Sequence, residues 1–216
     1  MKEYDKSFGF FEGLASVSLD GKWGFINNKG EEIIPLIYDY GFNFNEGLAK
    51  ITLNGKYGYI NTIGKEIIPC KYDMLTRISE GLTAVRGNDY KWGYINIKNE
   101  LVILYKYDFA GNFREGFARI RIGHEWGYIN TKGEEIIPCR YSMARKFSNG
   151  IAKVRIGKLW GLINKEGKEL APIIYKTISD FKDGIAEIEI DDKFGFMNTE
   201  GKVIAIYKYT ISDTRD

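Results

Sequence analysis

The sequence predicts an all-β protein built as a tandem array, and three observations support this fold class. The segment Lys22–Asn27 (KWGFIN) recurs with little change six times along the 216 residues. The central glycines of its copies are 34, 35, 34, 34 and 34 residues apart, so one period runs through the chain. Between the copies, short segments alternate apolar and polar residues and end at Gly or Asn, which is typical of strands and turns.

Repetition from end to end predicts one repeat domain over residues 1–216, with no linker. The repeats fall at approximately 10–43, 44–77, 78–112, 113–146, 147–180 and 181–214. Residues 1–9 align with the end of a repeat, so we expect them to be the remnant of a preceding one. The extra residue of the third repeat falls near Gly87–Tyr90, which we expect to be a loop because loops accept insertions at little cost.

Each repeat opens with an acidic or amide residue followed by glycine. A short alternating segment such as Leu48–Ile51 comes next and predicts a first strand. A brief loop then leads into the Trp-Gly segment, so the two strands should pair as an antiparallel hairpin. The opening pairs are Glu12-Gly13, Glu46-Gly47, Glu80-Gly81, Glu115-Gly116, Asn149-Gly150 and Asp183-Gly184.

The Trp-Gly segment carries an aromatic residue and then a glycine in every copy. Glycine weakens a strand, so its recurrence predicts that a ring or backbone of a neighbouring strand approaches closely there. We therefore interpret these pairs as the structural anchors of the repeats: Trp23-Gly24, Tyr57-Gly58, Trp92-Gly93, Trp126-Gly127, Trp160-Gly161 and Phe194-Gly195.

An Asn closes each Trp-Gly segment and predicts a turn, because its side chain can bond its own backbone. A third strand follows, such as Glu32–Ile34, and in four repeats it should stop at a proline or lie at a sheet edge. The prolines are Pro35, Pro69, Pro138 and Pro172. A tyrosine follows in every repeat.

The repeated pattern, aromatic-Gly-aromatic-Ile-Asn-x-x-Gly-x-Glu-Ile-Ile-Pro-x-x-Tyr-Asp, resembles the WG repeat family of bacterial proteins. Departures are local, since Tyr57 and Phe194 replace the tryptophan. The resemblance implies a β-rich array of interaction modules, and it brings no catalytic residues.

About three strands of roughly five residues fit the 34-residue period with ordinary connections. We therefore expect six three-stranded β-meander repeats in an open β-solenoid or superhelix. The alternative is a closed six-bladed ring like a β-propeller, whose blades generally have four strands and a longer period.

Composition favours a folded protein with a core, and the charge pattern argues against a nucleic-acid partner. Thirty-one basic and twenty-nine acidic side chains are interspersed, whereas phosphate binding needs a concentrated basic face. No N-terminal apolar segment and no apolar run of about 18 residues is seen, so we expect a cytoplasmic protein with no membrane span. Cys70 and Cys139 are interpreted as two buried or half-buried thiols in a reducing compartment.

No constellation for catalysis is found, so we expect no enzyme, no cofactor and no metal site. His124 is the one histidine and should be exposed in a loop, which argues against zinc and histidine-based triads. The carboxylates that recur beside glycine are interpreted as turn acceptors or partners of cations, because catalysis needs one distinctive cluster instead of six approximate copies.

One row of residues is a candidate ligand stripe. A cation precedes the tyrosine of several repeats, and together they could contact an anionic or extended ligand. The alternative is a solvated edge balanced by nearby aspartates. The stripe consists of Lys71, Tyr72, Lys106, Tyr107, Arg140 and Tyr141.

Two functions follow as hypotheses. The first is a monomeric, non-catalytic scaffold that binds a protein or peptide along its repetitive β surface. The second is carbohydrate or cell-envelope binding, because the aromatic hairpins resemble those of choline- and glucan-binding repeats, a class that usually needs export.

Overall fold

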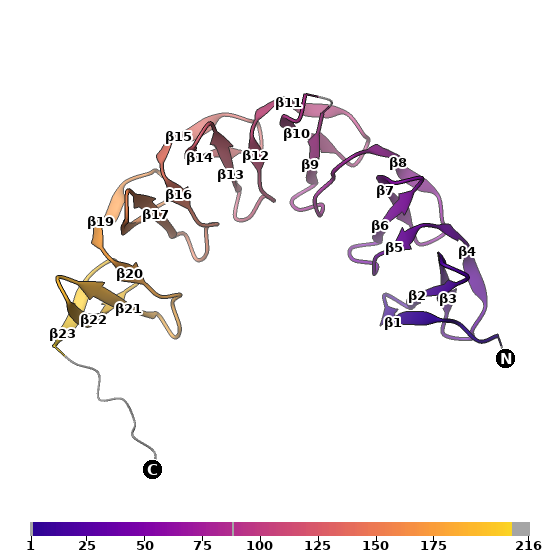
Figure 1. Ribbon diagram of the computed structural model, residues 1–216, viewed down its shortest axis with the longest axis horizontal. Helices are drawn as coiled ribbons and strands as arrows, with labels where there is room; N and C mark the ends of the chain where they lie inside the picture. The colour runs from indigo at the N-terminus through magenta and orange to yellow at the C-terminus, as the bar shows by residue number, and fades with distance from the viewer. Residues whose placement is uncertain (1, 88, 209–216) are drawn as a thin grey trace, which may run out of the picture. The chain divides into compact units, whose positions relative to one another are not determined.

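The structure, a computed structural model, describes residues 2–87 and 89–208. These residues contain strands and turns but no helix, and the strands form six antiparallel sheets that follow one another along the chain (Figure 1). None of the sheets closes on itself, and in each the strands pair in sequence order. The all-β prediction is confirmed. The chain divides into two compact units, Met1–Lys106 and Tyr107–Asp216, where repetition alone predicts a single domain.

Unit 1 (Met1–Lys106) holds sheets 1 to 3. Sheet 1 consists of β1 (Lys6–Phe11), β2 (Leu14–Leu19), β3 (Lys22–Asn27) and β4 (Glu32–Tyr38). Sheet 2 consists of β5 (Tyr40–Gly41), β6 (Leu48–Leu53), β7 (Lys56–Asn61) and β8 (Glu66–Tyr72). Sheet 3 consists of β9 (Leu82–Arg86), β10 (Trp92–Asn96) and β11 (Leu101–Tyr107).

Unit 2 (Tyr107–Asp216) holds sheets 4 to 6. Sheet 4 consists of β12 (Phe109–Ala110), β13 (Phe117–Ile122), β14 (Glu125–Asn130) and β15 (Glu135–Tyr141). Sheet 5 consists of β16 (Met143–Ala144), β17 (Ala152–Ile156), β18 (Leu159–Ile163) and β19 (Glu169–Tyr175). Sheet 6 consists of β20 (Thr177–Ile178), β21 (Ile185–Ile190), β22 (Lys193–Asn198) and β23 (Val203–Tyr207).

The expected number of strands is corrected, because five of the described sheets have four strands instead of three. The additional strand lies just before the residue-Gly pair and is only two residues long in sheets such as sheet 2, where it is β5. So short a strand shows no alternation in the sequence. In sheet 3 its place is taken by a single bridge between Leu75 and Val85. Each sheet therefore begins before the repeat predicted from the sequence, and Lys6–Phe11 is the first strand of sheet 1 instead of a remnant.

The prolines do not end their strands. Strand β4 continues through Pro35 to Tyr38, and the three other proline-containing strands behave in the same way. These strands are last in their sheets, so the missing N–H faces no further strand and the predicted edge position is confirmed. The pairing of β3 with β4 shifts register on both sides of Phe25, which marks a bulge beside the proline.

The apolar cores lie between successive sheets and not within one sheet. Phe25 and Ile34 of sheet 1 pack with Ala49 and Ile51 of sheet 2, and Phe44 closes the same cluster. Equivalent clusters join sheets 2 and 3, sheets 4 and 5, and sheets 5 and 6. This confirms that each repeat buries its apolar face against a neighbour in the sequence.

The glycine after each anchor aromatic is explained by the backbone of the next strand. A Cβ atom on Gly24 would lie 2.5 Å from the carbonyl oxygen of Ile34, and one on Gly127 would lie 2.5 Å from that of Ile137. The same approach, at 2.4 to 2.9 Å, recurs at the other four glycines. The predicted close approach is therefore confirmed, and it is made by main chain.

The anchor aromatics themselves are less buried than expected. Trp23 is buried, but the tryptophans of sheets 3 to 5 are half-buried and Phe194 is 37% exposed. The most buried ring stands two residues later, as Phe25, Tyr94 and Tyr128, each with 0% of its surface exposed. Both positions share one face of the strand, and the second is the more deeply buried of the two.

Candidate binding grooves

The residue-Gly pairs form tight turns that hold the first strand of each sheet. Glu12 and Gly13 have φ values of 52° and 81°, and both residues of the other five pairs also have positive φ values close to these. Two consecutive residues of this kind form a two-residue hairpin turn, which explains the recurrent glycine. In sheet 2 the turn is closed by two hydrogen bonds between Asn45 and Leu48.

The carboxylates of these turns tie one repeat to the next. Glu12 accepts hydrogen bonds from the backbone N–H groups of Glu46 (2.7 Å) and Gly47 (2.9 Å). Glu115 accepts in the same way from Asn149 (2.7 Å) and Gly150 (2.8 Å). The bond from Gly150 is the main reason why the pKa of Glu115 is lowered. For these two carboxylates, the interpretation as turn acceptors is confirmed.

The Asn that closes each Trp-Gly segment also serves the backbone. The side-chain oxygen of Asn27 accepts from the N–H groups of Lys29 (2.9 Å) and Glu31 (3.0 Å). The five other copies accept from the equivalent groups two and four residues later. The predicted turn is therefore confirmed in all six repeats.

The candidate ligand stripe does not form an aromatic surface. Tyr72, Tyr107 and Tyr141 are 9%, 1% and 1% exposed, so their rings belong to the interior. Lys71 lies over the ring of Tyr72 at 5.2 Å from its centroid, and Arg140 lies over that of Tyr141 at 5.1 Å. The three cations of the stripe, Lys71, Lys106 and Arg140, are exposed. Tyr209, the last tyrosine of the series, lies outside the described residues.

Two other tyrosines position the segments that border the grooves described below. The hydroxyl group of Tyr59 in sheet 2 donates to the carbonyl oxygen of Thr76 (3.1 Å) and accepts from the N–H group of Ile78 (3.2 Å). In unit 2, the hydroxyl group of Tyr128 donates to the carbonyl oxygen of Arg145. In both cases a buried ring of one sheet holds the first segment of the next.

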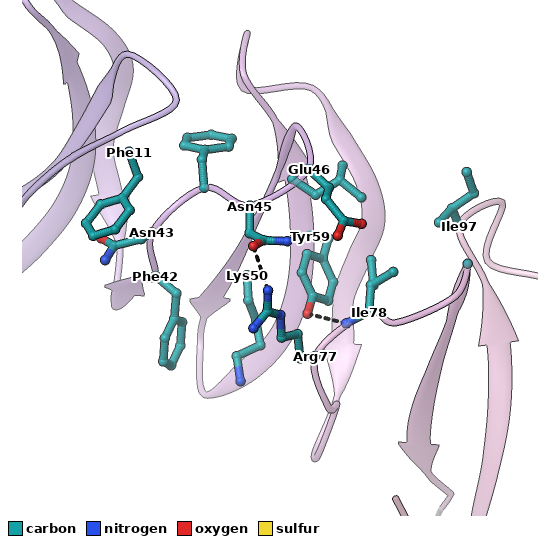
Figure 2. A pocket seen from close by; sticks show the side chains of 13 residues that line it. Phe11, Phe42, Asn43, Asn45, Glu46, Lys50, Tyr59, Arg77, Ile78 and Ile97 are labelled. Atoms are coloured by element: carbon teal, nitrogen blue, oxygen red, sulfur yellow. Dashed lines mark hydrogen bonds between the residues drawn. The ribbon is translucent and has the colours of Figure 1, made fainter. Parts of the chain in front are cut away.

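The first groove lies in unit 1 and has a volume of about 650 Å³. Its walls are mainly apolar, with Phe11 and Phe42 on one side and Ile97 on the other, while Lys50 and Arg77 stand between them (Figure 2). Phe11, Phe42 and Ile97 are 45%, 36% and 48% exposed. The groove therefore presents apolar surface to solvent beside two cations.

Lys50 has an unusual environment for a lysine. Its ammonium group lies 4.3 Å from the ring centroid of Phe42 and 5.3 Å from that of Tyr57. Burial lowers the pKa of Lys50. Arg77 donates to the side-chain oxygen of Asn45 at 2.6 Å, which fixes its guanidinium group at the groove.

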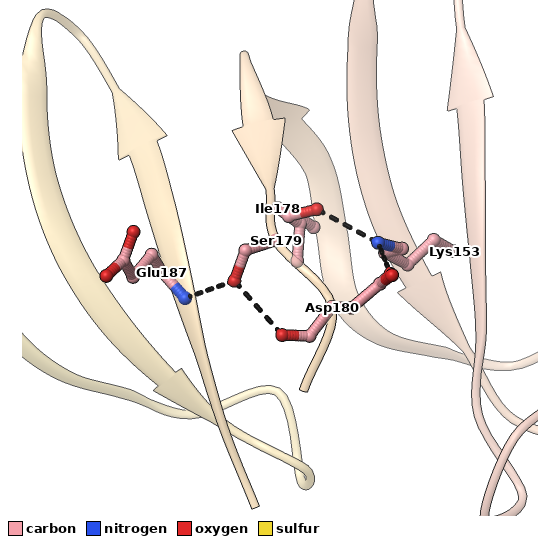
Figure 3. A network of polar contacts seen from close by, with 5 residues as sticks. All are labelled: Lys153, Ile178, Ser179, Asp180 and Glu187. Carbon is pink, nitrogen blue, oxygen red and sulfur yellow. Dashed lines mark hydrogen bonds and ion pairs between the residues drawn. The ribbon is translucent and has the colours of Figure 1, made fainter. Parts of the chain in front are cut away.

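The second groove lies in unit 2 and has a volume of about 720 Å³. Its lining includes four cations, Arg119, Arg145, Lys146 and Lys153, but only one carboxylate, Asp180. Lys153 reaches from sheet 5 to the first segment of sheet 6, where it donates to the carbonyl oxygen of Ile178 (3.1 Å) and to the carboxylate of Asp180 (2.5 Å; Figure 3). That ion pair lowers the pKa of Asp180.

The two grooves occupy equivalent positions of their units but differ in chemistry. Eight of the ten lining residues of the second groove stand 103 positions after lining residues of the first, the exceptions being Arg119 and Thr199. Among these pairs, Arg145 corresponds to Phe42, Lys146 to Asn43, Lys153 to Lys50 and Asp180 to Arg77. Sequence reasoning missed these residues. The one signal in the sequence was that the residue type at these positions differs from repeat to repeat, while the glycine, asparagine and core positions stay constant.

The remaining candidates for chemistry are dispersed. His124 is exposed, as predicted. Cys70 and Cys139 are free, half-buried thiols, and burial raises the pKa of each to about 11. Within the described residues, no three His, Cys, Asp or Glu side chains gather as metal ligands would. The described part of the chain also contains no helix that could cross a membrane.

Solved structures that are similar to this chain share little of its sequence. KlHsv2 with loop 6CD replaced by a Gly-Ser linker gives a TM-score of 0.51 at 9% identity, over 94% of this chain and 80% of that chain. BamB from Moraxella catarrhalis gives 0.46 at 10% identity, over 91% and 73%. The WD40 β-propeller domain of Doa1 gives 0.39 at 10% identity, over 96% and 84%.

A comparison with curated proteins finds no significant match. The family model for the WG containing repeat, by contrast, matches six consecutive segments that span nearly the whole chain. The matched segments are residues 2–23, 23–57, 57–92, 92–123, 126–160 and 160–194. Together with the sixfold frame of glycine, asparagine and buried rings, these matches show that the chain belongs to the WG containing repeat family.

Proposed function

We propose that this protein is a non-catalytic interaction module that binds a peptide segment of a partner protein, and that the first groove is the binding site. The observation that carries the proposal is the apolar surface left open there, on Phe11, Phe42 and Ile97, beside Lys50 and Arg77. Repeat arrays commonly bind through surfaces of this kind, in which variable side chains stand on a constant frame.

The lining residues favour a peptide with a large apolar side chain next to a carboxylate. The apolar side chain would cover the exposed rings, which gains about 25 cal/mol for each Å² removed from water. The carboxylate would meet Lys50 and Arg77, the two cations of the groove. Lys50 has aromatic faces as its contacts, and no ion pair of Lys50 is found in the described residues. A partner's carboxylate would offset the free-energy cost of burying the ammonium group of Lys50.

The size of the groove suits a short segment. A volume of about 650 Å³ lies within the range of roughly 300 to 1,000 Å³ that is typical of ligand pockets. It would take two or three side chains of an extended peptide, while the rest of the peptide stays outside.

Carbohydrate binding is the alternative, and the rings of sheet 1 argue against it. Sugars stack on open aromatic faces, but Trp23 is stacked on Phe8 at 5.1 Å between ring centroids and also contacts Tyr40 at 4.9 Å. Trp23 is only 6% exposed, so this ring, at least, offers no open face for a sugar.

A peptide-display selection on the full chain tests the proposal. We expect enriched peptides to combine a large apolar residue with Asp or Glu. Binding should weaken at least tenfold in Phe42→Thr and in Lys50→Ala. These replacements are the residues that the next repeat carries at the same positions, Thr76 and Ala84, so the fold should accept them.

Lys71→Ala is the matched control, since Lys71 is exposed but does not line the groove. Peptides without an apolar residue, or affinities unchanged in both groove variants, would refute the peptide site. Binding on a glycan array that depends on Phe42 would instead favour the carbohydrate alternative.

A further inference from the structure

We propose that the second groove is a separate binding site, which takes an acidic peptide segment through Arg119, Arg145 and Lys146. The proposal does not depend on the function of the first groove, because it rests on different residues in the other unit.

The cations of the second groove outnumber the carboxylates that could neutralise them. Lys153 is paired with Asp180, but within the described residues no carboxylate bonds to Arg119, Arg145 or Lys146. Burial lowers the pKa of Arg119, and the nearby charge of Arg145 acts in the same direction. Like charges held together in a groove repel, and a bound anion would relieve the repulsion.

The frame of the groove holds these cations in place. One guanidinium nitrogen of Arg119 donates to the carbonyl oxygen of Ala144 at 3.0 Å, and its group lies 5.2 Å from the ring centroid of Trp126. The backbone of Arg145 is bonded to Tyr128 through its carbonyl oxygen and to Lys153 through its N–H group. The side chain of Arg119 and the backbone of Arg145 are therefore held in place before a ligand arrives, which lowers the entropic cost of binding.

A peptide fits the groove better than a nucleic acid does. Single-stranded nucleic acids need open aromatic faces on which bases can stack. In unit 2 the ring of Trp126 is covered by Arg119 and Arg121, and the ring of Trp160 by Arg145 and Arg155.

The neighbouring repeat supplies replacements that the fold already accepts. Ser179 and Asp180 stand 34 residues after Arg145 and Lys146, at the same positions of sheet 6. The double variant Arg145→Ser/Lys146→Asp therefore removes two cations and adds a carboxylate without a new backbone requirement.

The experiment is fluorescence anisotropy of the full chain with three labelled probes: hexaglutamate, hexaglutamine and a short oligothymidine. We expect hexaglutamate to bind, hexaglutamine not to bind, and added salt to weaken binding. In the double variant the Kd for hexaglutamate should rise roughly tenfold or more, because two cations are lost and a carboxylate is added.

Lys132→Ala, at an exposed lysine of the same unit outside the groove, should bind like the wild type. If the double variant melts at a lower temperature, the single variant Arg145→Ser gives the same comparison. Equal binding of hexaglutamate and hexaglutamine would overturn the proposal, as would hexaglutamate binding that the groove variants leave unchanged. Tighter binding of oligothymidine would assign the groove to nucleic acid and overturn it as well.

Discussion

At the scale of single residues, the constant positions of the repeat serve the backbone. The Asn after the Trp-Gly segment bonds two N–H groups of its own turn in every repeat. The glycine lies under the carbonyl group of the next strand. Both roles follow from local chemistry, so the sequence alone could predict them.

The close approach at the glycine makes a direct prediction for stability. We expect Gly127→Ala to cost about 3 kcal/mol of unfolding free energy, because its Cβ would meet main-chain atoms that cannot move without breaking the sheet. Gly123→Ala is the control: it has φ +60° but no atom within 4 Å of the added Cβ, and should cost about 1 kcal/mol. Urea denaturation measures both, and equal costs would contradict the steric explanation.

The two thiols predict a dependence on alkaline pH. Because burial raises their pKa from 9.0 to about 11, the folded state holds the thiol proton more tightly than the unfolded state. The resulting stability is fully present below the unfolded pKa near 9 and is lost as pH rises through the folded pKa near 11. We expect Cys70→Ser/Cys139→Ser to lose less stability than the wild type across this window, measured by urea melts at each pH. Parallel losses would argue against thiol burial as the cause.

Other residues could not be assigned from the sequence, because their environment depends on the neighbouring sheet. Tyr72 and Tyr141 look like surface partners of the adjacent cations in the sequence, yet both are covered by the next sheet. Trp126 looks like the main core ring, yet Tyr128 occupies the centre of the interface. Alternation shows on which face of a strand a residue lies. It does not show which residues along that face are covered by the neighbouring sheet.

At the scale of the elements, the short first strand and its turn connect successive sheets. The sequence predicted the hairpin of the second and third strands, since their alternation is clear. It did not reveal β5, β12, β16 or β20, which are two residues long and pair with the strand that follows them. The strands that contain proline were expected to stop there, since proline lacks the N–H donor. They continue because of a bulge beside the proline, and this bulge has no sequence signature of its own.

The carboxylate that joins two turns gives an element-scale prediction. We expect Glu115→Gln to lower the unfolding free energy by about 1 to 2 kcal/mol, because the amide loses the charge-assisted bonds to Asn149 and Gly150. The pKa of Glu115 is lowered from 4.5, so its contribution is present above the unfolded pKa and is lost as pH falls through the folded pKa.

Chemical denaturation at neutral and acid pH measures this effect. The difference between wild type and variant should shrink in acid. Glu166→Gln, at an exposed position of the same unit, should have almost no effect at either pH. A difference that persists in acid would show that the carboxylate charge is not the cause.

At the scale of the whole molecule, one frame carries different chemistry in its two units. Phe42 and Asn43 give the first groove an uncharged edge, and Arg145 and Lys146 give the equivalent edge of the second groove two cations. The sequence predicted the all-β array and the stacking of neighbours, since both follow from periodicity. It could not predict the grooves, because a groove forms from the variable residues of neighbouring sheets, and only the fold brings those residues together.

The exchange of these two positions tests most directly whether groove side chains on a constant frame decide what is bound. In Phe42→Arg/Asn43→Lys, the first groove receives the residues of the second. We expect the melting temperature to change by only a few degrees, because both residue pairs already occur at this position. Isothermal titration calorimetry should show that the variant no longer binds the peptides selected by display. It should also show a second binding site for hexaglutamate, in addition to the one in the second groove. An unfolded protein, or an unchanged preference for the apolar peptides, would contradict this explanation of binding.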